Sequence, residues 1–306
     1  LYVFARKQGL KVILFTNATL ITLHLVELFS KITPLEKILV TVYGMKRTSY
    51  ESVTRVKGSF EAARRGVNLL LDYKIPFFVR GALLPFNKNE IEEFKAWAVT
   101  IPWMVEPPVY SMFFNLRSRR DKVKNRLIKS MRLSPEEGLR ILTRSEYNYI
   151  TRMQEFCSKF MHPLGDKLFS CGSGIDGGCI DAYGYFQPCM LLRHQGYVYN
   201  LKQGSLKDAL ENFFPKLRKT KTNNSEYLSR CAKCFLKCLC EQCPARSWME
   251  HGTLDTPVEY LCDIAHAQAR FLGLLGKNEK AWEVKEWKQR IDNFTGRSMA
   301  WEKRLI

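Results

Sequence analysis

Residues 231–243 read CAKCFLKCLCEQC, and this stretch indicates the kind of fold to which the chain belongs. It begins and ends with a Cys-x2-Cys pair, and a close pair of this kind can supply two thiolate ligands to a metal centre from one turn of backbone. Nine of the ten cysteines lie between Cys171 and Cys262, and only Cys157 lies outside. Cysteines concentrated in this way predict a domain built around thiolate-bound metal.

The size and composition of the chain argue against a disulfide framework. The chain has 306 residues, 46% of them hydrophobic and 25% charged, whereas disulfide frameworks are typical of small secreted domains. Residues 1–7, LYVFARK, form no signal peptide, and no apolar run reaches the length of about 18 residues that a membrane span needs. We therefore expect a cytoplasmic protein without a membrane partner. Because the chain begins without methionine, we also expect a fragment or a gene model that starts late.

The chain is strongly basic, with a net charge of +18 from 48 basic and 30 acidic residues. Residues 117–132 alone hold eight Lys or Arg and one Asp. A solvated helix or loop is the favoured interpretation of this stretch, and a groove for an acidic peptide or nucleic acid is the alternative. Two four-iron clusters, each with four thiolates, would offset about four of the positive charges.

The first 116 residues alternate between strand-like and helix-like patterns. Short apolar runs separated by amphipathic segments are typical of a parallel sheet or barrel covered by helices. Ser59 is the expected N-cap of the second helix. The expected strands are 12–16, 37–43, 77–84 and 109–114, and the expected helices are 21–32, 59–73 and 89–98.

The rest of the chain changes in character after Ser134. Ser134 as N-cap and Pro135 at the first helical position predict a long helix that runs to about residue 160 and links two domains. Residues 181–186 predict a tight hairpin within a turn-rich, cysteine-rich region. The tail after His266 is expected to be helical.

Zinc competes with iron for these cysteines. A zinc ribbon also uses two Cys-x2-Cys pairs, but about 15–20 residues normally separate them, and here only five do. Two alternatives follow: a zinc-stabilised protein that binds nucleic acid, and a non-catalytic iron–sulfur protein that transfers electrons or acts as an accessory subunit.

The cysteine pattern resembles the SPASM domain of radical SAM enzymes, a module that carries auxiliary iron–sulfur clusters. The family signature is a cysteine, a variable stretch, Gly-x4-Cys, then Cys-x2-Cys-x5-Cys-x3-Cys and a distant cysteine. Gly184-x4-Cys189 fits the second part of this signature. The sequence departs from the signature at Cys243, which follows Cys240 after two residues and not three. Cys238 is therefore a possible substitute for Cys243 as ligand.

The resemblance implies two [4Fe-4S] clusters with interleaved ligands. The implied ligands are Cys171, Cys179, Cys189 and Cys243 for one cluster, and Cys231, Cys234, Cys240 and Cys262 for the other. Cys157 and Cys238 belong to neither set, and Cys157 is expected to be a small buried apolar residue.

The N-terminal half resembles the same family. Residues 15–21, FTNATLI, are similar to its TNGTLI segment, and residues 40–44 and 58–61 are similar to the next strand and its GSFE helix start. The implied fold is α/β: a partial (β/α) TIM-like radical SAM barrel that lacks its first strands, a small cysteine-rich α+β SPASM domain and a helical C-terminal tail. The implied parts are the barrel at 1–133, a linking helix at 134–165, the SPASM domain at 166–265 and the tail at 266–306.

The family requires a Cys-x3-Cys-x2-Cys loop and a Gly-Gly-Glu segment, and neither occurs in this sequence. In the family both precede the Thr-Asn segment. We therefore expect this chain alone to be inactive toward S-adenosylmethionine.

The complete enzyme implied by the resemblance is an oxidoreductase that modifies a peptide or protein side chain through a 5′-deoxyadenosyl radical. It would use S-adenosylmethionine, a third [4Fe-4S] cluster and an electron donor such as flavodoxin or ferredoxin. The candidates for contact with the nucleoside or substrate are Asn17, Thr41, Tyr43, Arg80 and Asn115. Thr41 is favoured for contact with the ribose. For each candidate, ordinary packing or capping at a strand end is the alternative.

The catalytic base is not indicated. In the formylglycine-forming group an Asp follows the cysteine that corresponds to Cys189, but here Met190 stands there, which disfavours this outcome. His194 lies close enough in sequence to substitute, although a surface or core histidine is the favoured interpretation.

Overall fold

The computed structural model describes residues 1–32, 37–106, 108–111, 121–144, 146–175 and 177–296. The chain divides into two compact units, one of residues 1–114 with 130–133 and the other of residues 115–129 with 134–306. No helix in these described ranges is both long enough and apolar enough to cross a membrane.

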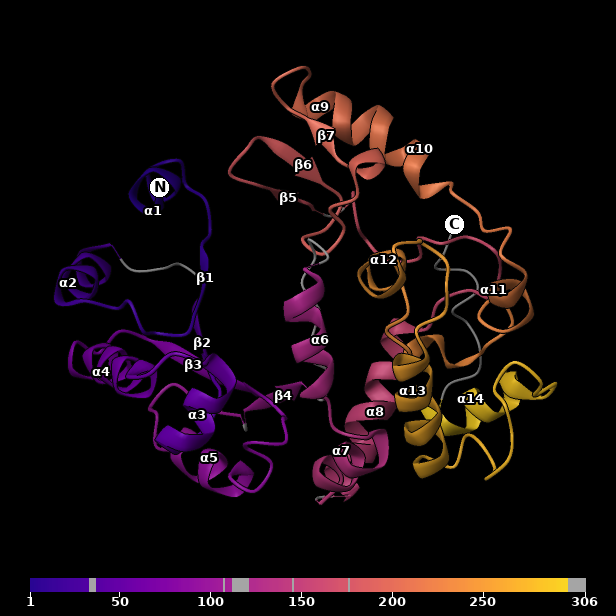
Figure 1. Ribbon diagram of the computed structural model, residues 1–306, viewed down its shortest axis with the longest axis horizontal. Helices are drawn as coiled ribbons and strands as arrows, with labels where there is room; N and C mark the ends of the chain where they lie inside the picture. Colours follow the sequence, from indigo (N-terminus) through magenta and orange to yellow (C-terminus); the bar gives the residue numbers. More distant parts are fainter. Residues whose placement is uncertain (33–36, 107, 112–120, 145, 176, 297–306) are drawn as a thin grey trace. The chain divides into compact units, whose positions relative to one another are not determined.

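The first unit is a parallel sheet with helices between its strands (Figure 1). The strand order follows the chain, and neighbouring strands pair in parallel, for example Thr41 with Arg80. The elements are α1 (Tyr2–Lys7), β1 (Ile13–Thr16), α2 (Leu23–Lys31), β2 (Lys37–Val42), α3 (Arg47–Thr54), α4 (Ser59–Asp72), β3 (Phe77–Ala82), α5 (Ile91–Ala98) and β4 (Val109–Ser111).

The two faces of this sheet differ in exposure. Ile38 and Val40 of β2 and Val79 of β3 are buried against side chains of α2, α4 and α5. The side chains that alternate with them point to the other face, where Phe15 is 58% exposed and Arg80 is exposed. Because side chains of a strand alternate between faces, one face forms the core of the unit and the other presents aromatic and polar groups.

Most predicted elements of this unit are present, with two corrections. The helices at 2–7 and 47–54 were not predicted. Gly58 and not Ser59 is the N-cap of α4: it adopts φ 80°, which suits glycine, and Ser59 is the first helical residue. The Ser59 hydroxyl instead lies 2.7 Å from that of Thr54.

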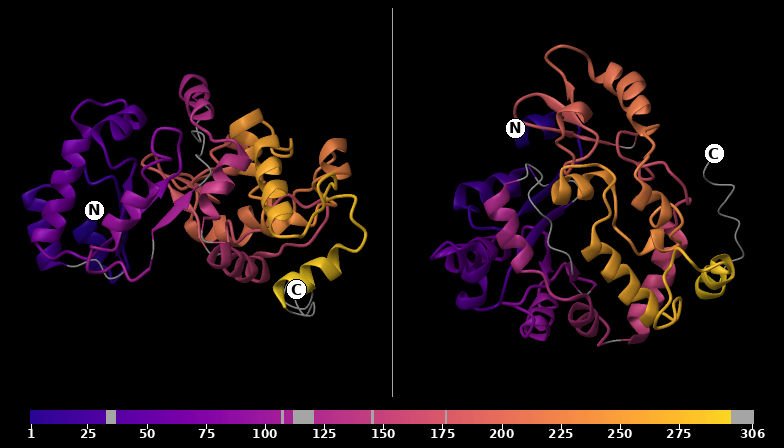
Figure 2. Two further views of the ribbon diagram at one scale, coloured as in Figure 1. Left: turned by 90° about the horizontal axis from the view of Figure 1, so that it is seen from below. Right: turned by 45° about the vertical axis from the view of Figure 1, so that its right-hand side comes forward.

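The second unit is mainly helical and carries a small antiparallel sheet in the order β5-β6-β7. The predicted hairpin is confirmed: Asp181 accepts hydrogen bonds from the backbone N–H of Tyr183 and Tyr185, and Gly184 has φ 86°. This sheet lies beside α10 (Phe214–Arg218), as Figure 1 and Figure 2 show, and Phe186 contacts Phe214 edge to face. The sheet elements are β5 (Cys179–Ile180), β6 (Tyr185–Gln187) and β7 (Tyr199–Asn200).

The predicted linking helix is two helices in the structure. Ser134 caps α7 (Pro135–Leu142) by accepting a hydrogen bond from the Glu137 backbone N–H at 3.2 Å, as expected. That helix ends at Leu142, and α8 (Glu146–Phe160) follows. The other helical elements are α6 (Lys122–Ser130), η1 (Gln195–Tyr197), α9 (Leu206–Asp208), η2 (Ala209–Phe213), α10 (Phe214–Arg218), α11 (Ser225–Ser229), η3 (Leu236–Cys238), α12 (Pro244–His251), α13 (Glu259–Phe271) and α14 (Trp287–Thr295).

The core of the second unit joins α8, η3, α13 and α14. Phe235 and Leu236 are fully buried there together with Ala269 of α13, and α8 contacts both η3 and α14. This core fixes the start of α13 relative to the turn-rich stretch that the cysteines occupy.

Candidate metal centre

Four of the predicted ligand cysteines line one pocket in the second unit. It contains about 480 Å³ of space, part of it open to solvent, and is walled also by apolar residues such as Val258 and Ala265. The pocket cysteines come from three segments: the turn after α11, the turn after η3 and the first turn of α13. They are Cys231, Cys234, Cys240 and Cys262.

Local backbone structure brings three of these thiols together. The N–H of Cys234 donates to the carbonyl of Cys231, and the N–H of Cys240 donates to the carbonyl of Leu236 at 2.8 Å. These tight turns return the chain to one place, and the packed core then adds Cys262 from α13.

Burial keeps these thiols protonated when no metal is bound. It raises the pKa of Cys231 to about 12 and that of Cys234 to about 11, and it also raises the pKa of Cys240 and Cys262. Metal ligation would therefore release protons from these groups.

A cationic side chain, Arg230, forms part of the pocket wall. Its guanidinium makes a two-point ion pair with Glu259 at 2.8 and 2.9 Å and a further bond to Glu226. One nitrogen lies 3.7 Å from the sulfur of Cys262, and the group stacks 5.0 Å from the ring of Trp282. The same arginine holds the pKa of Glu259 below its usual value.

His266 lies on the other side of Cys262. Its Nε2 accepts a hydrogen bond from the Ala281 N–H, so the proton is on Nδ1, which donates to the Cys262 carbonyl at 2.8 Å and lies 3.5 Å from its sulfur. Burial lowers the pKa of His266, which favours this neutral form.

The sequence interpretation missed Arg230, His266 and Trp282. A signal existed for two of them: Arg230 directly precedes Cys231, and His266 is four residues after Cys262, so it shares one face of α13.

The other four predicted ligands are not among the residues that line this pocket. Cys189 is near enough to Cys243 to raise its pKa, although burial is the larger cause. Cys179 pairs with Gln187, two residues before Cys189. Cys171 is exposed, and its loop is held by Arg218, which donates to the Cys171 carbonyl at 2.6 Å.

Cys238 has different surroundings from Cys243. It is 4% exposed, belongs to the helical core and shares a hydrogen bond with Cys157, itself 1% exposed. It is not among the residues that line the pocket. Across the described ranges, no three His, Cys, Asp or Glu side chains are close enough to hold a single metal ion.

In the first unit, three of the five nucleoside or substrate candidates lie together. Arg80 donates from Nε to the Thr41 hydroxyl at 3.4 Å and stacks 4.9 Å from the ring of Phe15. Its charge also acts on Tyr43, whose pKa burial raises. Asn17 instead forms a local turn after β1, and Asn115 lies outside the described residues.

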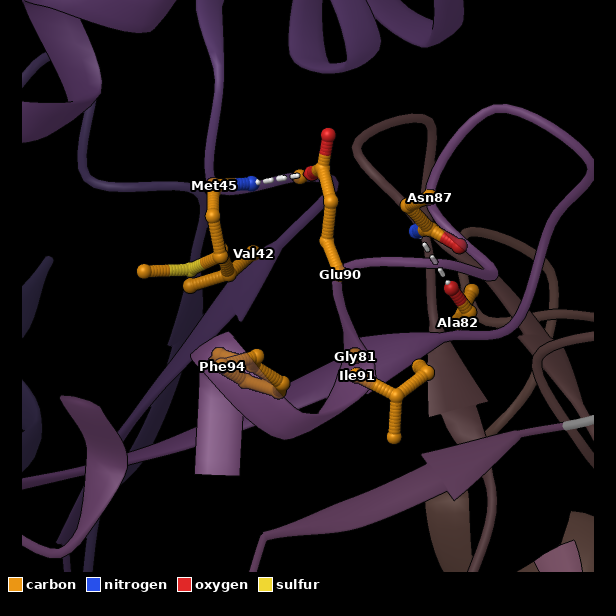
Figure 3. A pocket seen from close by; sticks show the side chains of 9 residues that line it. Val42, Met45, Gly81, Ala82, Asn87, Glu90, Ile91 and Phe94 are labelled. Carbon is orange, nitrogen blue, oxygen red and sulfur yellow. Dashed lines mark hydrogen bonds between the residues drawn. The ribbon is translucent and has the colours of Figure 1, made fainter. Parts of the chain in front are cut away.

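A small pocket at the ends of β2 and β3 contains two buried polar residues that the sequence interpretation did not identify (Figure 3). Asn87 donates to the carbonyls of Tyr43 and Ala82 at 2.9 and 2.8 Å. Glu90 accepts from the backbone N–H of Met45 at 2.7 Å and lies 2.7 Å from the Ser49 hydroxyl. These bonds hold the loop that follows Thr41 and Tyr43.

Neither residue near Cys189 forms a catalytic constellation in the structure. Met190 is 66% exposed. The His194 ring accepts a hydrogen bond from the Gly196 N–H at 3.1 Å, which caps η1, and it packs against Tyr197 and Trp248. This is a local structural role.

No protein-family model and no curated protein matches the chain. Solved structures of anSMEcpe do match in fold. One, with bound AdoMet and Cp18Cys peptide, has a TM-score of 0.51 at 15% identity and covers 93% of this chain and 76% of its own. Another, a hexahistidine-tagged form with bound AdoMet, has a TM-score of 0.51 at 14% identity. The match covers 99% of this chain and 78% of that one. That protein is an anaerobic sulfatase-maturating enzyme. At such identities the likeness concerns architecture, and the chain therefore has the fold of a radical SAM/SPASM enzyme.

Proposed function

We propose that this chain is the C-terminal portion of a radical SAM enzyme that modifies a peptide or protein side chain and holds two auxiliary [4Fe-4S] clusters. The observation that carries the proposal is the pocket lined by four cysteines from three segments of a chain with this fold. The matching anSMEcpe structures contain AdoMet and, in one, a peptide, which supports the same classes of cofactor and substrate here.

The pocket suits a cluster in its donor set and surroundings. Four thiols are the ligands that a [4Fe-4S] cluster takes. Zinc draws four sulfurs to about 2.3 Å from one point, whereas each thiolate of a cluster binds a different iron, so the sulfurs stay farther apart. The metal content of the reconstituted chain distinguishes the two centres. Arg230 and Lys237 add positive charge beside a group that is negative overall.

We assign the second cluster to Cys171, Cys179, Cys189 and Cys243. The proximity of Cys189 to Cys243 supports this choice over Cys238, which packs against Cys157 in the core. We place the SPASM domain at residues 166–265, with the tail at 266–306 contributing Trp282 to the pocket wall.

The exposed face of the parallel sheet is the proposed contact surface for nucleoside or substrate. Thr41 offers a hydroxyl, Arg80 a guanidinium and Phe15 a ring within a small area. S-adenosylmethionine and a third cluster would supply the radical chemistry of the complete enzyme, with electrons from a donor such as flavodoxin or ferredoxin. Thr41, Arg80 and Phe15 would bind and orient the nucleoside or the peptide.

The test is metal content after anaerobic reconstitution with iron and sulfide. The proposal predicts about eight irons and eight sulfides per chain, because two four-iron clusters bind. Cys234→Ala and Cys189→Ala should each retain about four irons. One or two zincs with no sulfide would contradict the proposal and favour a zinc-stabilised protein.

A matched pair of variants separates the two candidate ligands. Cys243→Ala should lose about four irons, whereas Cys238→Ala should keep all eight. The reverse result would transfer the ligand assignment to Cys238.

A further inference from the structure

Arg230 is held by ion pairs and also lines the pocket of the four cysteines. Glu259 and Glu226 form ion pairs with its guanidinium and fix its position, while the ring of Trp282 lies 5.0 Å from it. At the same time it lines the pocket of the four cysteines, with a nitrogen 3.7 Å from the sulfur of Cys262. Two glutamates outside the pocket, Glu226 and Glu259, therefore hold a guanidinium that lines the pocket.

One donor of this side chain has no partner. The Nε of Arg230 is buried and forms no hydrogen bond to any described residue. Burying an N–H without an acceptor costs about 1–3 kcal/mol, and such groups are rare in native proteins. Because Arg230 lines the pocket, a cluster there would bring sulfur acceptors to its guanidinium, whose Nη2 lies 3.7 Å from the Cys262 sulfur.

We propose that Arg230 is a positioning residue that raises the reduction potential of the cluster held by Cys231, Cys234, Cys240 and Cys262, through its charge and a hydrogen bond from its guanidinium. This inference rests on the proposed function of the pocket. A cluster gains negative charge on reduction, and nearby positive charge and hydrogen bonds to sulfur stabilise the reduced state.

The chain offers a close structural control in Arg290. Arg290 makes a two-point ion pair with Glu279 and a further pair with Glu286 four residues earlier, as Arg230 does with Glu259 and Glu226. The two side chains are also similarly exposed, at 26% and 21%. Arg290 is not among the residues that line the pocket.

The experiment is a redox titration of reconstituted chains monitored by electron paramagnetic resonance. Arg230→Gln, Arg230→Lys and Arg290→Gln are each measured in the whole chain and in a Cys189→Ala background, which should hold only the pocket cluster. We expect a more negative midpoint potential for Arg230→Gln, a smaller negative shift for Arg230→Lys, which keeps the charge, and no shift for Arg290→Gln.

The outcomes separate the two proposals. A wild-type chain whose pocket binds no iron would refute the proposed function before any potential is measured. Fully loaded Arg230 variants with an unchanged potential would refute only the role of Arg230. If Arg230→Gln binds little iron, the midpoint potential of Arg230→Lys decides instead. If neither variant binds the cluster, Arg230 is needed for cluster assembly, and its proposed effect on the reduction potential is overturned.

Discussion

At the scale of single residues, buried polar side chains do more than fill the core. Glu90 is only 8% exposed, yet its carboxylate accepts a hydrogen bond from the Met45 N–H (Figure 3). It also lies beside the Ser49 hydroxyl. Removal of such an acceptor leaves buried donors without partners, which costs more than the loss of a surface bond.

We therefore predict that Glu90→Ala destabilises the chain by about 2 kcal/mol, because the Met45 N–H loses its acceptor. Urea denaturation followed by circular dichroism measures this. Glu93→Ala is the control, since Glu93 is exposed in α5, which begins directly after Glu90, and should change stability by less than about 0.5 kcal/mol. Equal effects of the two variants would show that the Glu90 contacts contribute nothing specific.

At the scale of elements, close approach of backbones decides where helix α4 can lie. Gly66 is buried in this helix, and a Cβ at that position would lie 2.0 Å from the carbonyl oxygen of Ala18 in the turn after β1. The absence of a side chain is what lets the helix contact that turn. The same turn carries Asn17, so α4 supports one of the candidate site residues.

Gly66→Ala should destabilise the chain although alanine is the better helix former by about 1 kcal/mol. The reason is the clash with backbone, which cannot rotate away as a side chain can. Thermal unfolding compares it with Asn68→Ala, an exposed position of α4 where alanine should stabilise slightly. A Gly66→Ala chain as stable as wild type would contradict the close contact.

At the scale of the whole molecule, the fold and the cysteine pocket are present in a sequence without a Cys-x3-Cys-x2-Cys motif. That motif leaves one iron of its cluster free to bind S-adenosylmethionine. Eight cysteines in two sets of four would instead ligate every iron of both clusters. Binding of S-adenosylmethionine would therefore depend on that motif, and binding of the auxiliary clusters on these eight cysteines.

We predict that residues 1–306, reconstituted to about eight irons, form no 5′-deoxyadenosine with S-adenosylmethionine and dithionite. Chromatography of the quenched reaction measures the product. The measured iron and sulfide content is the control, because it shows that the auxiliary clusters are loaded. Stoichiometric 5′-deoxyadenosine would overturn the expectation and require an open iron within these residues.

Local patterns were sufficient for much of the first unit. Short apolar runs predicted its strands and amphipathic segments predicted most of its helices, because buried strands and half-buried helices leave patterns that the sequence records directly. The hairpin at Asp181 and Gly184 and the cap at Ser134 were also predicted, since turn and cap chemistry depends on neighbours in sequence. The break between α7 and α8 was missed, because a strong helix start gave no signal of where the helix ends.

The sequence by itself determined the cysteine-rich centre: Cys231, Cys234 and Cys240 lie within ten residues and share local turns. Only the tertiary structure decided what surrounds them. Arg230 meets Glu259 and Trp282, residues 29 and 52 positions later, because the core of α8, η3 and α13 packs these segments together. Such long-range contacts follow from burial of apolar surface, which has no fixed spacing in sequence, and the wall of the pocket could therefore not be predicted from the spacing of its cysteines.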